Sequence, residues 1–363
     1  MGILPAKLHH VGLVVRDIET IAGGYAELFG LDTWCVHHVA ESVTEATIRG
    51  ATAQISGRVG VGAAPWGDEF WLIEPGAGRS GYKDFQATNG HGIHHLAFAA
   101  DPAETERSVD AFAALGVDVA QRYEIAGVGQ VTELDTRELL GGYYVQLVTS
   151  ASTGRFELPR GDLLDLSGSY ARPDGMGPLP APRGIQHFGV VVRDMVKHLD
   201  AYEQVFGIGD WIVQNWRTEP GSLESPTFEG RPVEHEYFAA ASPFDGPLGF
   251  EVVQPTLGPS DYKENFLQVV GEGIHHLNVV GLDDHRHWLR LRDWLEGAGV
   301  SVCMSGTLMG GIAEFYYLDT RRRLGGIAIE CFGMDPEADL TTVKPRGPYY
   351  RITKGLPPHE AGT

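Results

Sequence analysis

The chain contains few cysteines and no long apolar run. Only Cys35, Cys303 and Cys331 occur among its 363 residues, and an odd, scattered set is typical of reduced thiols rather than of a disulfide framework. No segment approaches the roughly 20 consecutive apolar residues that a membrane-spanning helix needs. The opening MGILPAKLHH is too short and too polar for a signal peptide. We therefore expect a cytoplasmic protein with no membrane anchor.

Basic residues are scarce relative to acidic ones. Lys and Arg number 28, against 48 Asp and Glu, which gives a formal net charge of −20. A field of this sign repels nucleic acid phosphates and anionic membranes, so neither is expected as a partner. We expect a small-molecule substrate, with polyanionic compounds disfavoured, and the sequence is compatible with a homodimer.

A histidine-bearing apolar strand occurs four times. It reads HHVGLVV at 9–15, HHLAFAA at 94–100, QHFGVVV at 186–192 and HHLNVVG at 275–281. Nearly constant offsets relate the two halves of the chain, namely 177 residues for His10 and His187, 181 for His95 and His276, and 184 for Asp135 and Asp319. The chain is therefore a tandem repeat of two similar halves, each made of two smaller units.

Each unit is predicted to form β-α-β-β-β. In the first, Asp17 can cap a helix whose apolar residues recur at helical spacing as far as Gly30. Corresponding helices are predicted near 102–115, near 195–206 and near 284–297. About three short strands, separated by Gly, Pro or Asp turns, follow each helix. The predicted fold class is thus α+β, built from four βαβββ modules.

The composition also gives domain boundaries. We expect an N-terminal domain at 1–150 and a C-terminal domain at 184–333. The segment 151–183 is rich in Gly, Pro, Ser and Asp, which predicts a linker with little regular structure. A Pro- and Gly-rich tail follows at 334–363.

These repeats resemble the vicinal oxygen chelate superfamily, which includes glyoxalase I, methylmalonyl-CoA epimerase, extradiol dioxygenases and 4-hydroxyphenylpyruvate dioxygenase. The likeness rests on the strand histidines, on GIHHLAF at 92–98, on LDTR at 134–137 and on the Gly-Gly strand that follows. The local sequence of these motifs is most similar to that of the methylmalonyl-CoA epimerase branch. The resemblance implies that the modules pair into two open-barrel, glyoxalase-like domains with a metal inside.

The resemblance also implies one metal ligand from each of four strands. In the C-terminal half these positions hold His187, Glu251, His276 and Glu330. Two imidazoles and two carboxylates suit one divalent ion, which could be Zn, Ni, Co, Mn or Fe(II). Because QHFGVVV has only His187, strand alternation predicts that His276 faces inward and His275 outward.

The N-terminal half lacks this set. Its matching positions hold His10, Trp71, His95 and Gln146, so both carboxylates are missing. An indole and an amide do not replace anionic ligands. This half is therefore predicted to be metal-free.

The preferred function is a metal-dependent epimerase or isomerase that acts through an enolate. Its substrate would be a cyclic polyhydroxy ketone of the cyclitol type or a 2-substituted acyl-CoA. By the same resemblance, Glu234 and Glu330 would be the acid/base pair. In the N-terminal half, Gln54 occupies the position that matches Glu234. Alternation places Glu236 on the same inward face as Glu234 and His235 on the other.

Two alternatives stay open. The first is an Fe(II)-dependent extradiol or keto-acid dioxygenase, which uses two histidines and one carboxylate, with His235, Tyr237 and His285 as acid/base candidates. Glu251 distinguishes the dioxygenase from the isomerase, because a fourth protein ligand crowds the position on the metal where O₂ would bind and so favours redox-neutral chemistry. The second is a non-catalytic protein that binds a small molecule. The duplicated Asp-Thr-Arg at 135–137 and 319–321 and Tyr-Lys at 82–83 and 262–263 are interpreted as structural.

Overall fold

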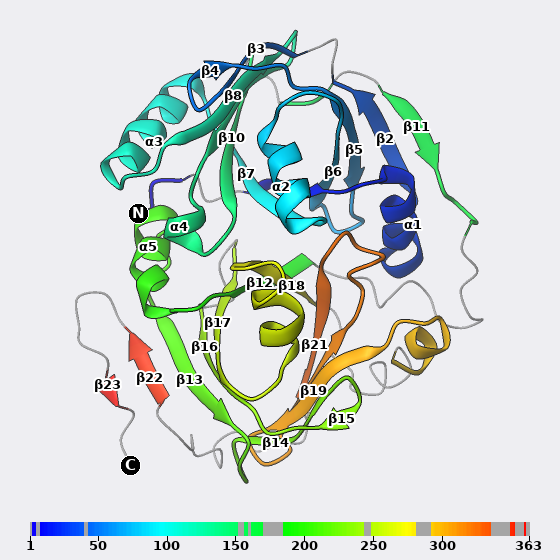
Figure 1. Cartoon of the computed structure of the whole chain (residues 1–363), viewed down its shortest axis with the longest axis vertical. Coiled ribbons are helices and arrows are strands. Elements are labelled where there is room, and N and C mark those ends of the chain that lie inside the picture. The colour runs from blue at the N-terminus through cyan, green and yellow to red at the C-terminus, as the bar shows by residue number, and fades with distance from the viewer. Residues whose placement is uncertain are drawn as a thin grey trace. The chain divides into compact units, whose positions relative to one another are not determined.

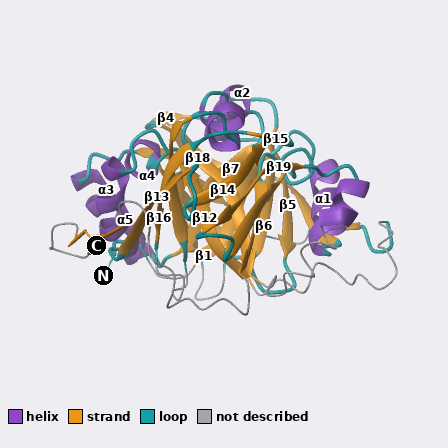
Figure 2. Cartoon of the chain, turned by 90° about the horizontal axis from the view of Figure 1, so that it is seen from below, coloured by secondary structure: helices purple, strands orange, loops and turns teal. Residues whose placement is uncertain are grey.

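The computed structural model describes residues 2–4, 8–39, 43–151, 156–158, 161–169, 184–242, 248–280, 292–334, 349–352 and 359–360. The chain divides into two compact units, one formed mainly by Met1–Pro178 and the other mainly by residues from Leu179 onward (Figure 1). Strands make up most of the described structure and helices are few (Figure 2). No helix in these ranges is long and apolar enough to cross a membrane.

In the described part of the first unit, eleven strands form one curled sheet in the order β11-β2-β5-β6-β1-β7-β10-β9-β8-β3-β4. The strands are β1 (Leu8–Val14), β2 (Thr33–His38), β3 (Val43–Ile48), β4 (Ala51–Thr52), β5 (Gly57–Ala63), β6 (Glu69–Pro75), β7 (Gly92–Ala99), β8 (Val119–Ile125), β9 (Gly129–Leu134), β10 (Tyr144–Ser150) and β11 (Asp162–Asp165). The helices are α1 (Ile18–Phe29), α2 (Gly81–Asn89), α3 (Pro102–Ala114) and α4 (Arg137–Leu140).

Helix α1 shows how the local sequence sets these elements. The side chain of Asp17 accepts a hydrogen bond from Thr20 N at the N-terminus, as an N-cap does. Gly30 ends the helix with φ of 69°, a left-handed conformation that favours glycine. Between them, the residues at helical spacing are buried, as predicted.

The second unit repeats this plan. Its described strands form a sheet of twelve in the order β15-β14-β19-β20-β21-β18-β12-β17-β16-β13-β22-β23. They are β12 (Gly184–Val191), β13 (Trp211–Arg217), β14 (Leu223–Phe228), β15 (Arg231–Pro232), β16 (Glu236–Ala241), β17 (Phe250–Leu257), β18 (Gly273–Val280), β19 (Val302–Leu308), β20 (Ala313–Leu318), β21 (Ala328–Met334), β22 (Tyr349–Ile352) and β23 (His359–Glu360). Helix α5 (Val196–Phe206) and the π-helical turn η1 (Asp261–Leu267) accompany them.

The predicted α+β fold of paired βαβββ modules is confirmed. Within each unit the first strands of the two modules pair antiparallel, β1 with β7 and β12 with β18, and so join the modules into one half-barrel. Of the helix predicted near 284–297, residues 292–297 are helical and 281–291 lie outside the described residues.

Three strands lie in the predicted linker and in the Pro- and Gly-rich tail. β11 falls within 151–183 and pairs with β2 at the edge of the first sheet. β22 falls within 334–363 and pairs with β13, and β23 pairs with β22. Each extends an open sheet edge, where unpaired backbone groups accept a further strand.

Candidate metal centre

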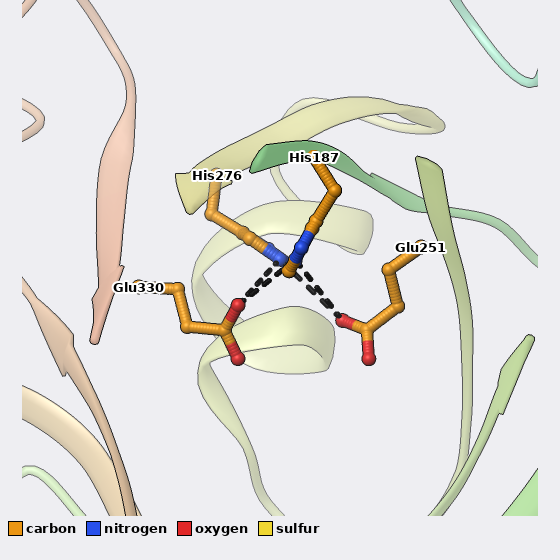
Figure 3. A group of neighbouring side chains, drawn as sticks. All are labelled: His187, Glu251, His276 and Glu330. Atoms are coloured by element: carbon orange, nitrogen blue, oxygen red, sulfur yellow. Dashed lines mark ion pairs between the residues drawn. The ribbon is translucent and has the colours of Figure 1, made fainter. Parts of the chain in front are cut away.

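Four side chains with the character of metal ligands meet on one face of the second sheet (Figure 3). His187 comes from β12, Glu251 from β17, His276 from β18 and Glu330 from β21. Each offers one ligand atom, and these atoms all lie within 4.8 Å of one another. The two imidazoles and the two carboxylates point toward a common point. The structure therefore brings together all four residues that the sequence nominated as ligands.

Strand pairing explains why residues so distant in sequence meet. β12 lies between β17 and β18, and Gly189 of β12 is opposite both Glu251 and His276. β18 pairs in parallel with β21, which carries Glu330. Side chains alternate between the two faces of a strand, so His187, two residues before Gly189, shares a face with its neighbours' ligands.

Gly189 is itself a requirement of the site. A Cβ at this position would overlap the imidazole of His276, so a larger residue would displace that ring. Gly12 has the same relation to His95 in the first sheet. The sequence shows this as a histidine followed two residues later by glycine, at 10–12 and at 187–189.

His187, His276 and Glu330 are buried and Glu251 is partly buried, and the four groups interact electrostatically. Glu330 Oε2 lies 2.9 Å from His187 Nε2 and 3.6 Å from His276 Nε2, while Glu251 Oε2 lies 4.0 and 3.5 Å from the same nitrogens. Burial lowers the pKa of His187, but the hydrogen bond and charge of Glu330 outweigh it and raise the pKa overall. Burial conversely raises the pKa of Glu330, and the hydrogen bond from His187 with the nearby imidazoles reverses this.

The arrangement fits a divalent cation. Among the described residues, His276 Nε2 and Glu251 Oε2 are buried and have no hydrogen-bond partner. A buried polar group left in this way costs about 1–3 kcal/mol. A cation between the carboxylates would satisfy both atoms, and imidazole with carboxylate is a ligand set for Zn, Mn, Fe, Co or Ni.

Glu330 is held by neighbours that sequence reasoning missed. Tyr317 Oη donates to Glu330 Oε1 at 2.9 Å, and Asn278 Nδ2 donates to Glu330 Oε2 at 3.0 Å. Tyr262 Oη donates to Tyr317 Oη at 2.6 Å. The residue opposite Glu330 on β20 is Tyr317. In the sequence, Tyr317 is recognisable only as a tyrosine on the strand before the one that carries Glu330. Its contact with Glu330 follows from the pairing of these two strands.

The structure corrects the prediction for Glu234. This residue is exposed and precedes β16, so it does not join the cluster. Its predicted counterpart Gln54 is exposed too, whereas the next residues, His235 and Ile55, are both buried. Glu234 and Gln54 are therefore equivalent, as the comparison of the two halves predicted. The buried face of this segment, however, carries His235 and not Glu234. The inward set on β16 includes Tyr237, while Glu236 is bonded to Arg217 and Asn215.

His235 is the buried polar residue that this register places inside. Its side chain ring lies 5.5 Å from that of Tyr237. Burial lowers its pKa to about 4, so it is neutral at physiological pH. Within the described ranges, neither ring nitrogen has a hydrogen-bond partner. His285, the other histidine considered for acid/base work, lies outside the described residues.

The first sheet closes the corresponding position with its own side chains. His10 Nε2 and His95 Nε2 lie 3.1 Å apart, within hydrogen-bond distance of each other. Trp71 stacks on His10 with 3.9 Å between ring centroids and 7° between planes. Gln146 donates to Tyr82 Oη at 3.0 Å. The two imidazoles thus pair with one another where the second sheet has carboxylates.

A carboxylate does lie near this point, on a different strand. Glu133 of β9 is opposite Gln146, and its Oε2 lies 3.6 and 3.9 Å from the Nδ1 atoms of His94 and His95. Glu133 therefore lies on the Nδ1 side of the His95 ring, and His10 lies on the opposite, Nε2 side. Burial raises the pKa of Glu133 to about 8, so the group is mainly protonated at neutral pH. The four matched positions of the first half thus lack the two carboxylates of the second, although His94, His95 and Glu133 themselves place their ligand atoms within 4.8 Å of one another.

We expect the substitution Glu133→Gln to change how stability depends on pH. The folded state binds the proton up to about pH 8, whereas an unfolded chain releases it near about pH 4.3. The free energy of unfolding should therefore fall between these pH values, by up to about 1.4 kcal/mol per pH unit. Thermal unfolding of wild type and variant, with a chelator present, should show that Glu133→Gln flattens this fall. Asp110→Asn on the exposed face of α3 is the control, and parallel curves for Glu133→Gln and wild type would contradict the assignment.

Comparison with known proteins gives one family match. Residues 9–131 match the model of the family described as the Glyoxalase/Bleomycin resistance protein/Dioxygenase superfamily. No curated protein matches the chain.

Among solved structures, a mutant of 4-hydroxymandelate synthase from Streptomyces coelicolor is similar over 92% of this chain and 93% of that one, with 14% identity and a TM-score of 0.58. The Mn(II)-bound glyoxalase from Novosphingobium aromaticivorans has 16% identity, coverage of 93% and 85%, and a TM-score of 0.42. The 2,3-dioxygenase LapB from Pseudomonas sp. KL28 has 13% identity, coverage of 92% and 95%, and a TM-score of 0.43. At 14% identity, the similarity to 4-hydroxymandelate synthase shows a shared fold and does not transfer an activity to this chain.

Proposed function

Because the chain belongs to the glyoxalase/bleomycin resistance protein/dioxygenase superfamily, a group of metal-dependent vicinal oxygen chelate enzymes, we propose that it is a metal-dependent isomerase or epimerase. The proposal depends on one observation, the convergence of two imidazoles and two carboxylates on a single point. His187, Glu251, His276 and Glu330 would hold one divalent ion. The first half, with Trp71 and Gln146 at the positions of the two carboxylates, would bind no metal at the corresponding point.

The proposed chemistry is removal and return of a proton beside a carbonyl group. A divalent ion at this point supplies Lewis acidity, which stabilises the negative charge of an enolate. The two carboxylates differ in their restraints. Glu330 is fixed by Tyr317, Asn278 and His187, whereas for Glu251 the described residues provide no such hydrogen bonds to Oε2.

This difference assigns the roles. Glu251, with its side chain 18% exposed, is the carboxylate free to take a proton from the substrate carbon. Glu330 lies on the other side of the cluster and, in an epimerase, would relay to the opposite face a proton from Tyr317 Oη, which donates to Glu330 Oε1 at 2.9 Å. A positioned base or acid of this kind contributes about 10²–10⁴-fold to a rate. Glu251 thus replaces Glu234 in the acid/base pair.

The substrate class follows from the same chemistry. A carbonyl oxygen and a neighbouring oxygen would both face the ion, as in a cyclic polyhydroxy ketone of the cyclitol type. A 2-substituted acyl-CoA is the second candidate. The net charge of −20 disfavours it, because CoA phosphates need basic partners.

A dioxygenase is the second candidate function, and one observation favours it. His187, His276 and Glu330 by themselves form a two-histidine, one-carboxylate set, and Glu330 lies closer to His187 than Glu251 does, at 2.9 against 4.0 Å. Non-haem Fe(II) oxygenases use such a set with open positions. His235 and Tyr237 would then be the nearby groups able to exchange protons.

Metal analysis combined with solvent exchange tests the proposal. Protein purified without added metal is expected to contain about one equivalent of Zn, Ni, Co or Mn. In D₂O it should introduce deuterium beside the carbonyl of cyclic polyhydroxy ketones, as seen by NMR, and a chelator should stop this exchange. Iron together with oxygen uptake on catechols, and no exchange, would establish the dioxygenase instead. A metal-free protein that retains a small molecule would identify a binding protein.

A further inference from the structure

We infer that Asp261 and His275 are positioning residues that fix the metal-facing nitrogen of His276. The inference rests on the proposed metal site and adds two residues to which no role in it has been assigned. Asp261 opens the turn η1, which follows β17, and His275 precedes His276 on β18. Neither side chain reaches the ligand cluster itself, so both would act through His276.

The three side chains form a continuous buried chain. Asp261 Oδ2 lies 2.8 Å from His275 Nε2, and His275 Nδ1 lies 3.0 Å from His276 Nδ1. All three residues have 0% exposure. The predicted outward direction of His275 is therefore a direction toward Asp261, not toward water.

Hydrogen-bond polarity gives this chain one direction. Arg321 Nη1 lies 3.1 Å from Asp261 Oδ1, and Asn265 Nδ2 donates to the same oxygen at 2.8 Å. A carboxylate held by these donors only accepts, so His275 Nε2 carries the proton. With neutral rings, His275 Nδ1 then accepts from His276 Nδ1.

The consequence is a defined tautomer of the ligand. With its proton on Nδ1, His276 presents the lone pair of Nε2 to Glu251 and Glu330, at 3.5 and 3.6 Å. That is the form that coordinates a metal. A ligand imidazole whose other nitrogen bonds to a group tied to a carboxylate is also more basic and fixed in orientation.

The first half provides an internal comparison. It keeps the doublet, with His94 Nδ1 3.1 Å from His95 Nδ1. Ser80-Gly81-Tyr82-Lys83 matches Ser260-Asp261-Tyr262-Lys263, so glycine stands where the second half has Asp261. In the described residues, His94 Nε2 has no hydrogen-bond partner. The first half therefore lacks the carboxylate end of this hydrogen-bonded series, and it also lacks the two ligand carboxylates.

The arginine of the duplicated Asp-Thr-Arg motif differs accordingly. In the second half Arg321 bonds to Asp319 and to Asp261. In the first half Arg137 bonds to Asp135 and lies over the ring of Tyr144, 4.6 Å from its centroid. Tyr144 stacks in turn on His94, with 4.4 Å between centroids. The motif has a turn role in both halves, and in the second it also anchors the carboxylate of the chain.

Metal affinity is the readout, because it does not depend on catalysis. Asp261→Asn keeps the shape of the side chain and removes its charge. We expect it to raise the dissociation constant for Zn(II) about 10–100-fold, as measured by competition with a chromophoric chelator. The visible absorption of the Co(II)-loaded protein should shift as well, since it reports the ligand field. His94→Gln, which changes the first-half counterpart of His275, is the control and should change neither.

A double-mutant cycle separates positioning from general destabilisation. His275→Phe keeps a ring of similar shape among the aromatic side chains of Tyr262 and Phe266 but breaks the chain. If Asp261 acts through His275, adding Asp261→Asn to His275→Phe should weaken metal binding no further. Thermal unfolding of each apo protein shows that the variants fold.

The outcomes are distinct. Wild-type affinity in Asp261→Asn or His275→Phe, or full additivity in the double variant, would overturn the inference and leave the proposed function intact. A wild-type protein that binds no divalent ion would overturn the proposed function, and the inference with it.

Discussion

The substitution Glu330→Gln is expected to abolish tight metal binding and to lower the isomerase activity by about 10³-fold or more. Glu330 is the carboxylate nearest to His187, at 2.9 Å, and accepts hydrogen bonds from Tyr317 and Asn278. Glutamine fills the same volume but carries no charge. It would leave two imidazoles and one distant carboxylate around the ion.

The first half shows the expected end state of this change, because Gln146 already occupies the equivalent position. The measurements are metal content after dialysis, the dissociation constant for Zn(II) and the rate of solvent exchange into substrate. Gln146→Ala is the matched control and should alter none of the three. Full metal occupancy in Glu330→Gln would show that the second sheet does not bind an ion through this residue.

The substitution Glu251→Gln is expected to separate chemistry from metal binding. The remaining ligands His187, His276 and Glu330 can still hold an ion, so occupancy should persist with weaker affinity. The proton acceptor would be gone, and exchange with solvent should fall by about 10²–10⁴-fold. Because Glu251 is the less restrained carboxylate, the protein should remain folded.

The same variant distinguishes the two candidate reactions. An isomerase that loses Glu251 loses its activity while keeping a metal. A dioxygenase needs only two histidines and one carboxylate, so its oxygen uptake on catechols should survive or rise as a position on the metal opens. Solvent exchange at the wild-type rate in Glu251→Gln would remove this residue from the acid/base pair.

Local sequence patterns predict most of the fold. The repeated histidine strands and their offsets identify two halves of two modules, and the capped helix that begins after Asp17 lies where its spacing places it. Strand alternation also predicts that His276, and not His275, faces the cluster. These are properties of neighbouring residues, which the chain carries wherever it folds.

Around Glu234 alternation holds, but the inward face was assigned wrongly. Residues 233–235 lie outside β16, which begins at Glu236, and the pairing of β16 with β17 shifts between Glu236 and Tyr237. Burial nevertheless alternates from Glu234 to Tyr237, so the error was the choice of inward face, which the resemblance supplied and which local alternation cannot decide. His235 and Tyr237 occupy the inside. The strands β11 and β22 were likewise not predicted, because what stabilises them is a partner edge far away in the sequence.

The amino-acid sequence by itself determined the tandem architecture and the four residues that converge in the second half, because repeats and residue types are read along one chain. Only the tertiary structure decided what surrounds them. Tyr317 and Asn278 contact Glu330 because their strands are neighbours, and Asp261 is connected to His276 only through His275. In the first half, Glu133 lies beside Gln146 because β9 and β10 pair. Register between strands is a long-range property, since it depends on pairing between distant segments, and no local pattern encodes it.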